Sequence, residues 1–318
     1  MRLTSSVGLG VRALCSAGLS CLVLLLSAFT LAAAGGAFLL GAPIAVGIET
    51  GFEDRPLSLV AVAAVPVVPC FVVVVVRAIR LERLTLLDGA VPLAEEDNAN
   101  TRAVDAAATR IATQFGISKP RIRIRPDRTP FAYATYRPGD PVVAVRRNGS
   151  PILVLSKGLI ETLPERELEA VLAHEVAHLS NDDLQLTSWL LVPLFAAEFL
   201  HDDGERPWDG DPIGWLLATV ALVGVGVFSR GREIAADRAA VAATGDPGSL
   251  ASALERLDDH RSSRPTTDLR KHAKSTNAVS VLPTLGTADS PSGLRSTHPP
   301  LETRLEALRS LSRERRTP

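Results

Sequence analysis

Two histidines and a glutamate near the middle of the chain have the types and spacing needed to bind a metal ion and activate water. They form the segment HEVAH at residues 174–178, with apolar residues before and after it. Residues four apart share one face of an α-helix, so His174 and His178 can bind one ion, and Glu175 can reach a water on that ion. The pattern favours a zinc site over a pair of hydrogen-bonded or solvent-facing histidines.

A further ligand must come from elsewhere, because catalytic zinc takes three protein ligands and keeps one position for water. The candidate is Glu233, in the segment SRGREIAAD at residues 229–237. Glu233 and Asp237 are four apart, so on a helix Glu233 can bind the metal while Asp237 accepts the free N–H of a ligating histidine. Alternatively, the two acids form surface pairs with Arg230 or Arg238. We expect one Zn²⁺ per chain.

Metal-assisted peptide hydrolysis is the chemistry that these residues predict. Zinc lowers the pKa of its bound water towards ~7, and Glu175 takes the proton of the attacking water and returns it to the leaving amine. His298, if it folds back over the site, can donate a hydrogen bond to the developing oxyanion. The alternative for His298 is a capping or exposed position ahead of Pro299.

Two helices are expected around the motif. Apolar residues recur with helical spacing over residues 98–115, and Gly116 follows as a helix end. The HEVAH helix begins after Lys157-Gly158, with Pro164 and nearby acidic residues suited to its first turn.

A small sheet is expected between these helices. Two short apolar runs at residues 142–145 and 152–155 flank Asn148-Gly149, a strong β-hairpin signal. This hairpin is either a plain sheet edge or a template along which an extended peptide lies.

The first part of the chain is apolar enough to enter a membrane. No charged residue lies between Arg12 and Glu49, or between Arg55 and Arg77. Each stretch can supply the ~20 apolar residues of a span, so we expect an N-terminal transmembrane hairpin. The alternative for the first stretch is a cleaved signal peptide ending near Ala34.

Two weaker apolar stretches cover residues 184–200 and 212–229, joined by an acidic loop. We expect them to form a second membrane hairpin, with a buried hairpin of soluble helices as the alternative. Arginines flank the four spans on one side, at positions such as Arg2, Arg80 and Arg230. The positive-inside rule then places both termini and the catalytic part on the cytoplasmic side of the cell membrane.

Composition excludes several classes of protein. The 318 residues include 34 Lys and Arg and 35 Asp and Glu, for a net charge of -1, so we expect no nucleic-acid partner. The three cysteines all lie in apolar runs and fit neither a disulfide framework nor a zinc pattern. A transporter is disfavoured because the strong spans hold no acidic or basic residue.

The order of these motifs resembles the HtpX-type membrane zinc endopeptidases, relatives of the CAAX prenyl proteases. The resemblance runs from about residue 75 to the end, through HEVAHLSNDD, a membrane hairpin, SRGREIAAD and the HPPL segment at 298–301. One departure is Thr129-Pro130-Phe131-Ala132, where the family usually shows Asn-Ala-Phe-Ala. The resemblance implies a gluzincin fold, mainly α with a small β-sheet.

The resemblance also implies roles for individual residues. His174, His178 and Glu233 would ligate zinc and Glu175 would be the base, with Asp237 supporting a ligand. Further matches to family positions are Asn181 and Asp183 just after the motif helix, the late active-site histidine His298, and its partner Arg304.

Four parts of the chain are expected. Residues 1–80 form an N-terminal transmembrane hairpin, and residues 81–183 form a cytoplasmic catalytic part with the sheet and the HEVAH helix. Residues 184–229 form a second membrane hairpin, and residues 230–318 hold the third-ligand helix, a mobile Ser- and Pro-rich linker and the HPP segment.

The expected partners are the lipid bilayer and polypeptide substrates that are membrane or misfolded proteins. The resemblance implies protein quality control and the stress response; the alternatives are a CAAX-type prenyl-protein protease, an inactive zinc-binding membrane scaffold and a secreted metalloprotease.

Overall fold

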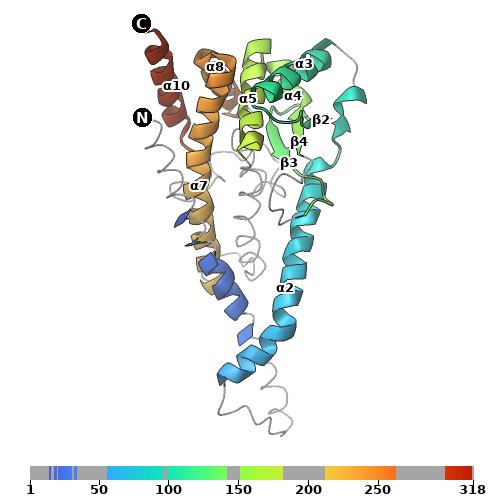
Figure 1. Ribbon diagram of the computed structural model, residues 1–318, viewed down its shortest axis with the longest axis vertical. Helices are drawn as coiled ribbons and strands as arrows, with labels where there is room; N and C mark the ends of the chain where they lie inside the picture. Colours follow the sequence, from blue (N-terminus) through green and yellow to red (C-terminus); the bar gives the residue numbers. More distant parts are fainter. Residues whose placement is uncertain are drawn as a thin grey trace.

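The described part of the chain is mainly helical with one small sheet, as the sequence predicts (Figure 1). The computed structural model describes residues 14–15, 18–19, 21–30, 32–33, 56–95, 99–141, 151–181, 212–262 and 298–316. Several predicted features therefore lie outside the described residues, namely the strand at 142–145, the apolar stretch at 184–200 and nearly all of the linker.

Two long helices, α2 and α7, extend downward in Figure 1 from an upper body that holds the sheet and the shorter helices. Helix α2 covers Pro56–Leu87, and α7 covers Pro212–Thr244. Helix α7 joins the fourth apolar stretch to SRGREIAAD without a break, so the predicted part boundary at residue 230 falls inside it. Among the described residues, we find no helix with the length and apolar character required of a membrane span.

The sheet has four strands in the order β1-β2-β4-β3. They are β1 (Val91–Pro92), β2 (Arg121–Arg125), β3 (Ala132–Thr135) and β4 (Ile152–Ser156). Strand β4 pairs parallel with β2 and antiparallel with β3. The strand at 152–155 is confirmed, but it is not a sheet edge, since hydrogen bonds to β2 and β3 occupy both of its sides.

The helices around the sheet are α3 (Ala99–Gln114), α4 (Lys157–Thr162), α5 (Glu165–Ser180), α8 (Pro247–Ser262) and α10 (Leu301–Arg316), with a short 3-10 helix η1 (Leu93–Glu95). The helix predicted to end at Gly116 is confirmed as α3, and Gly116 has a φ of 65. The single helix predicted after Lys157 is instead two helices. Leu163 is extended and Pro164 caps α5, so Pro164 separates the two helices.

Strand β4 is buried on both faces and divides the core in two. Leu153 and Leu155 face a large apolar cluster shared with α3, α5, α8 and α10, whereas Ile152 and Val154 join Tyr133 in a smaller cluster. The smaller cluster includes Leu86 at the end of α2. One face of β4 therefore shares a core with the motif helix α5, and the other face shares one with the end of α2.

Candidate metal centre

Helix α5 carries His174 and His178 into the protein interior. His174 is fully enclosed and His178 is 5% exposed. Their Nε2 atoms lie 3.1 Å apart, because residues one helical turn apart share a face. The i, i+4 prediction is thereby confirmed in its geometry, and the two nitrogens point to one location.

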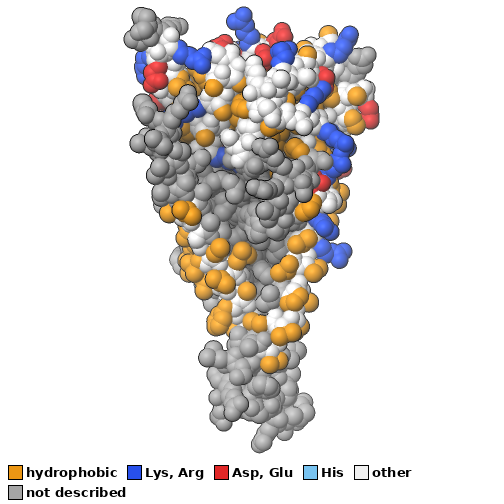
Figure 2. Space-filling model, viewed as in Figure 1, with side chains coloured by type: hydrophobic (Ala, Val, Ile, Leu, Met, Phe, Trp, Pro, Cys, Tyr) orange, Lys and Arg blue, Asp and Glu red, His pale blue; other side chains and the backbone are white. Residues whose placement is uncertain are grey.

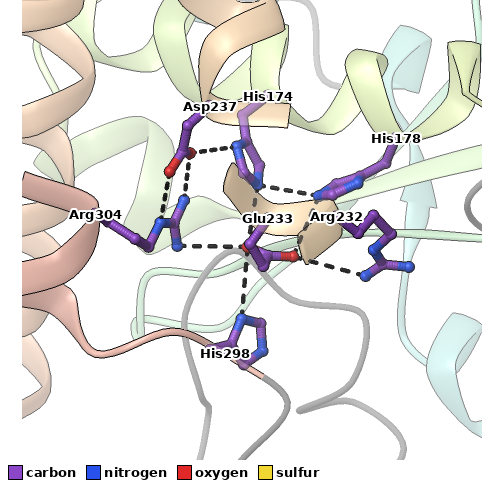
Figure 3. A network of polar contacts seen from close by, with 7 residues as sticks. All are labelled: His174, His178, Arg232, Glu233, Asp237, His298 and Arg304. Carbon is purple, nitrogen blue, oxygen red and sulfur yellow. Dashed lines mark hydrogen bonds and ion pairs between the residues drawn. The ribbon is translucent and has the colours of Figure 1, made fainter. Parts of the chain in front are cut away.

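Helix α7 brings Glu233 to the same location, because α5 and α7 pack along each other (Figure 3). One carboxylate oxygen, Oε2, lies 3.4 Å from Nε2 of His174, and the other, Oε1, lies 3.3 Å from Nε2 of His178. Four ligands placed tetrahedrally at zinc distances are about 3.3–3.4 Å from one another. The separations among these three residues therefore fit one zinc ion.

The surroundings of Glu233 are strongly cationic. Burial alone would raise the pKa of this carboxyl, but the nearby imidazoles of His298, His174 and His178 hold the pKa well below its ordinary value. The carboxylate is thus ionised, yet no described residue donates a normal hydrogen bond to either oxygen. A buried, charged carboxylate whose nearest donors stand beyond 3.2 Å suits a bound cation.

Asp237, one turn further along α7, holds His174 from behind. Its Oδ1 lies 2.9 Å from Nδ1 of His174, which leaves Nε2 directed at Glu233. Burial would lower the pKa of His174, but Asp237 and Glu233 outweigh burial and raise it to about 9. This is the arrangement in which a carboxylate fixes the orientation of a ligating histidine.

Arg304, on α10, completes a chain of charges behind the site. Its Nε and Nη2 donate to the two carboxylate oxygens of Asp237 at 2.9 and 2.6 Å, and its Nη1 lies 3.4 Å from Oε2 of Glu233. Burial would raise the pKa of Asp237, but the Arg304 charge and the contact with His174 lower it. The C-terminal helix therefore contributes directly to the shape of the centre.

His298 lies where the HPP segment enters the site, and it is buried. Its Nδ1 is 3.5 Å from Oε2 of Glu233. Figure 3 shows it on the side of Glu233 opposite His174. The histidine thus folds back over the site. That it donates a hydrogen bond to an oxyanion stays a prediction.

Glu175 is buried on α5 beside the two histidines, with 1% of its surface exposed. Burial raises the pKa of its carboxyl, and the charges of His174 and His178 partly oppose this rise. Neither oxygen has a hydrogen-bond partner among the described residues. A carboxyl with a raised pKa next to a metal centre suits a group that accepts and returns a proton.

Arg232 is the contributor that sequence reasoning missed. It is buried, and its Nη2 lies 3.6 Å from Oε1 of Glu233. In the sequence, Arg232 is one of the arginines that follow the apolar stretch 212–229, and an adjacent position on a helix points about 100° away from Glu233. The one sequence signal was a charged residue beside a candidate ligand.

The structure shows no contact with the metal centre for the two family positions just after the motif helix, of which it describes one. Asn181 is the exposed C-cap residue of α5, and its backbone N–H donates to the carbonyl of Ala177. Asp183 lies outside the described residues. The roles implied for these two residues remain predictions.

Comparison with known families and proteins agrees with this geometry. Residues 98–312 match the family described as Peptidase family M48. A Protease HtpX homolog of Moorella thermoacetica is 37% identical over 228 residues, which cover 66% of this chain and 72% of that protein. Protease HtpX homolog 2 of Methanosarcina acetivorans is 34% identical over 221 residues, covering 65% and 71%.

Among solved structures, the chain is similar to the crystal structure of S. mikatae Ste24p. The TM-score is 0.39 and the sequence identity 22%, over 86% of this chain. The chain spans less than two thirds of that protein, 63% of its length.

Proposed function

The chain belongs to peptidase family M48 and is a metalloprotease, and from this premise we propose that it is a zinc-dependent endopeptidase with the active site at HEVAH and Glu233. The observation that carries the proposal is the convergence of three buried side chains beside the buried Glu175. The Nε2 atoms of His174 and His178 lie 3.1 Å apart, and each of them lies 3.3–3.4 Å from one carboxylate oxygen of Glu233.

The ligands in this proposal are His174, His178 and Glu233, which would hold one Zn²⁺ per chain. Zinc bound there supplies a Lewis acid for the scissile carbonyl and makes water acidic enough to attack at neutral pH. Glu175 accepts the proton of the attacking water and then gives it to the leaving amine. His298 donates a hydrogen bond to the carbonyl oxygen as negative charge develops on it.

The proposed location is the cell membrane, with the active site on the cytoplasmic side. The charge-free stretches 13–48 and 56–76 support two N-terminal spans, and the arginines before the first stretch and after the second support the orientation. Stretches 184–200 and 212–229 would form the second hairpin. A reporter enzyme that is active only outside the cytoplasm should then be active when fused at Asp209. Activity there of a reporter that works only in the cytoplasm would instead support a chain with two spans.

The proposed substrates are membrane or misfolded proteins near that surface, which corresponds to a role in quality control. Helix α7 supports this, because it runs directly from the fourth apolar stretch into Glu233, so the centre would lie close to the bilayer. Prenylated proteins and non-catalytic zinc binding are the alternatives.

Cleavage of unfolded casein by the full chain in detergent tests the function. Glu175→Gln should abolish cleavage and keep bound zinc. The matched control is Glu169→Gln on the same helix, where the side chain is 31% exposed and pairs with Arg110. Equal cleavage by wild type and Glu175→Gln would contradict the proposal.

A further inference from the structure

Helix α2 carries two parallel rows of side chains that have the same order of types. One row is Val72, Val76, Arg80 and Leu84, and the other is Val73, Arg77 and Leu81. Each step is four residues, so each row follows one face of the helix, and the two rows are neighbours. In both rows an arginine follows valine, two residues in the first row and one in the second, and precedes a leucine.

This face is open and slightly hollowed. The seven residues line a groove of about 540 Å³. Val73 is 55% exposed and Leu81 is 62% exposed, which is unusual for large apolar side chains that follow one another along a helix. Figure 2 shows hydrophobic side chains along the lower length of α2 and Lys or Arg side chains where it joins the body.

The two arginines on the face form no ion pair or hydrogen bond within the described part of the chain, in contrast to their buried neighbour. Arg83 turns inward and donates to the carbonyl of Asp140 at 2.8 Å. Arg77 and Arg80 are exposed and one turn apart. Two cations therefore face outward at the point where the charge-free stretch 56–76 ends.

We propose that this groove binds one anionic phospholipid, with its phosphate between Arg77 and Arg80 and an acyl chain along Val72, Val73 and Val76. Two guanidinium groups can bind a phosphate through several charge-assisted hydrogen bonds. The valines continue from the arginines into the charge-free stretch, as an acyl chain would run from its headgroup. The leucines beyond the arginines lie level with the headgroup region.

Charge complementarity selects this occupant. An apolar peptide segment or a second copy of the chain would leave two buried arginines without an anion, which is costly. An anionic lipid provides both the charge and the apolar surface. The inference rests on the proposed membrane location. That location has its own test, because recovery of the chain in the soluble fraction of cells lysed without detergent would contradict it.

Native mass spectrometry of the full chain in detergent tests the site. The probes are phosphatidylglycerol and phosphatidylcholine with identical acyl chains, together with inorganic phosphate. Each arginine near an anionic headgroup raises the binding constant about fivefold. With two arginines, phosphatidylglycerol should therefore bind roughly 30-fold more tightly than phosphatidylcholine. Inorganic phosphate at millimolar concentration should not displace it.

Variants separate the two halves of the groove. Arg77→Gln with Arg80→Gln should remove the preference for phosphatidylglycerol, and Val73→Ser with Val76→Ser should weaken binding of both lipids. Arg110→Gln with Arg309→Gln is the charge-matched control, because both arginines are exposed on the body, and it should keep the preference. The same unfolding midpoint in all variants would show that each is folded.

Four results would overturn the proposal. They are equal binding of both lipids by wild type, an unchanged preference after loss of both arginines, displacement of lipid by inorganic phosphate, and a lipid-free dimer that the valine variant dissociates. The last result would assign the groove to a second copy of the chain.

Discussion

Arg304 holds Asp237 with two hydrogen bonds, of 2.9 and 2.6 Å, although the two residues are 67 positions apart in the chain. The same Asp237 oxygen that accepts the shorter bond lies 2.9 Å from Nδ1 of His174. The C-terminal helix is therefore linked to a candidate zinc ligand through one carboxylate (Figure 3).

Replacing Arg304 by alanine should damage both stability and metal binding. The change leaves the buried Asp237 without its guanidinium partner, and breaking a buried ion pair typically costs about 3–5 kcal/mol. Loss of a group that orients a ligand typically weakens metal affinity about 10–100-fold. Denaturant unfolding and zinc titration measure the two effects.

Arg309→Ala is the matched control on the same helix. Arg309 is exposed and pairs with Glu255, so its loss should change the free energy of unfolding by less than about 1 kcal/mol. If the Arg304→Ala and Arg309→Ala variants bind zinc with equal affinity, Arg304 does not act on the metal centre.

Zinc binding should strengthen as the pH rises. Without metal, the pKa of His174 is raised to about 9, so below that pH its imidazole is protonated and must lose a proton for Nε2 to bind zinc. Protonation therefore competes with zinc, and the apparent affinity should rise with pH until about 9 and then level off. Titrations at several pH values against a chelator of known affinity test this, and a pH-independent affinity between 6 and 8 would contradict it.

Asp246 should stabilise the start of α8 in a pH-dependent way. Its Oδ1 accepts hydrogen bonds from the backbone N–H groups of Gly248 and Ser249, and Oδ2 accepts one from the Ser249 hydroxyl. The Ser249 hydroxyl makes the largest contribution to lowering the pKa of Asp246 below 3.8. Asp246→Ala should cost about 1 kcal/mol at pH 7.

The sign of the pH effect follows from the lowered pKa. The contribution of Asp246 is fully present above its ordinary pKa of 3.8 and is lost as the pH falls through the lower, folded value. The difference in melting temperature between wild type and Asp246→Ala should therefore shrink below pH 4. Asp246→Asn, which can still cap the helix, is the control, and an undiminished difference at pH 3 would refute this account.

Gly158 is required by close packing rather than by backbone conformation. A Cβ at this position would lie 2.1 Å from the carbonyl oxygen of Arg128. The approach is enforced by a hydrogen bond of 2.9 Å from the Gly158 N–H to the carbonyl of Asp127. Gly158→Ala should destabilise the fold by about 1–3 kcal/mol in thermal or denaturant unfolding. Gly139→Ala, where a Cβ meets open space, should be nearly neutral; similar losses in both would exclude the steric explanation.

Much of the centre was predictable because its spacing is local. The pairs His174 with His178 and Glu233 with Asp237 are each one helical turn apart, and one turn is enough to define a shared face. The resemblance to a known family supplied Arg304 and His298, which local spacing alone could not place.

The rest depends on contacts between distant segments. Strand β4 lies between β2 and β3 because of parallel pairing with β2, which no local turn signal specifies. Arg232 and Glu233 are both buried, with Nη2 of Arg232 3.6 Å from Oε1 of Glu233, and this burial depends on how α7 packs in the body. Such contacts are set by the whole core and not by the neighbours of a residue in the sequence.

Zinc content and casein cleavage, measured on the same purified samples of wild type, Glu175→Gln and Glu233→Ala, test the central claim most directly. We predict one zinc per chain and cleavage for wild type, one zinc without cleavage for Glu175→Gln, and neither for Glu233→Ala. A Glu233→Ala protein that keeps one zinc and cleaves casein would contradict the proposed centre.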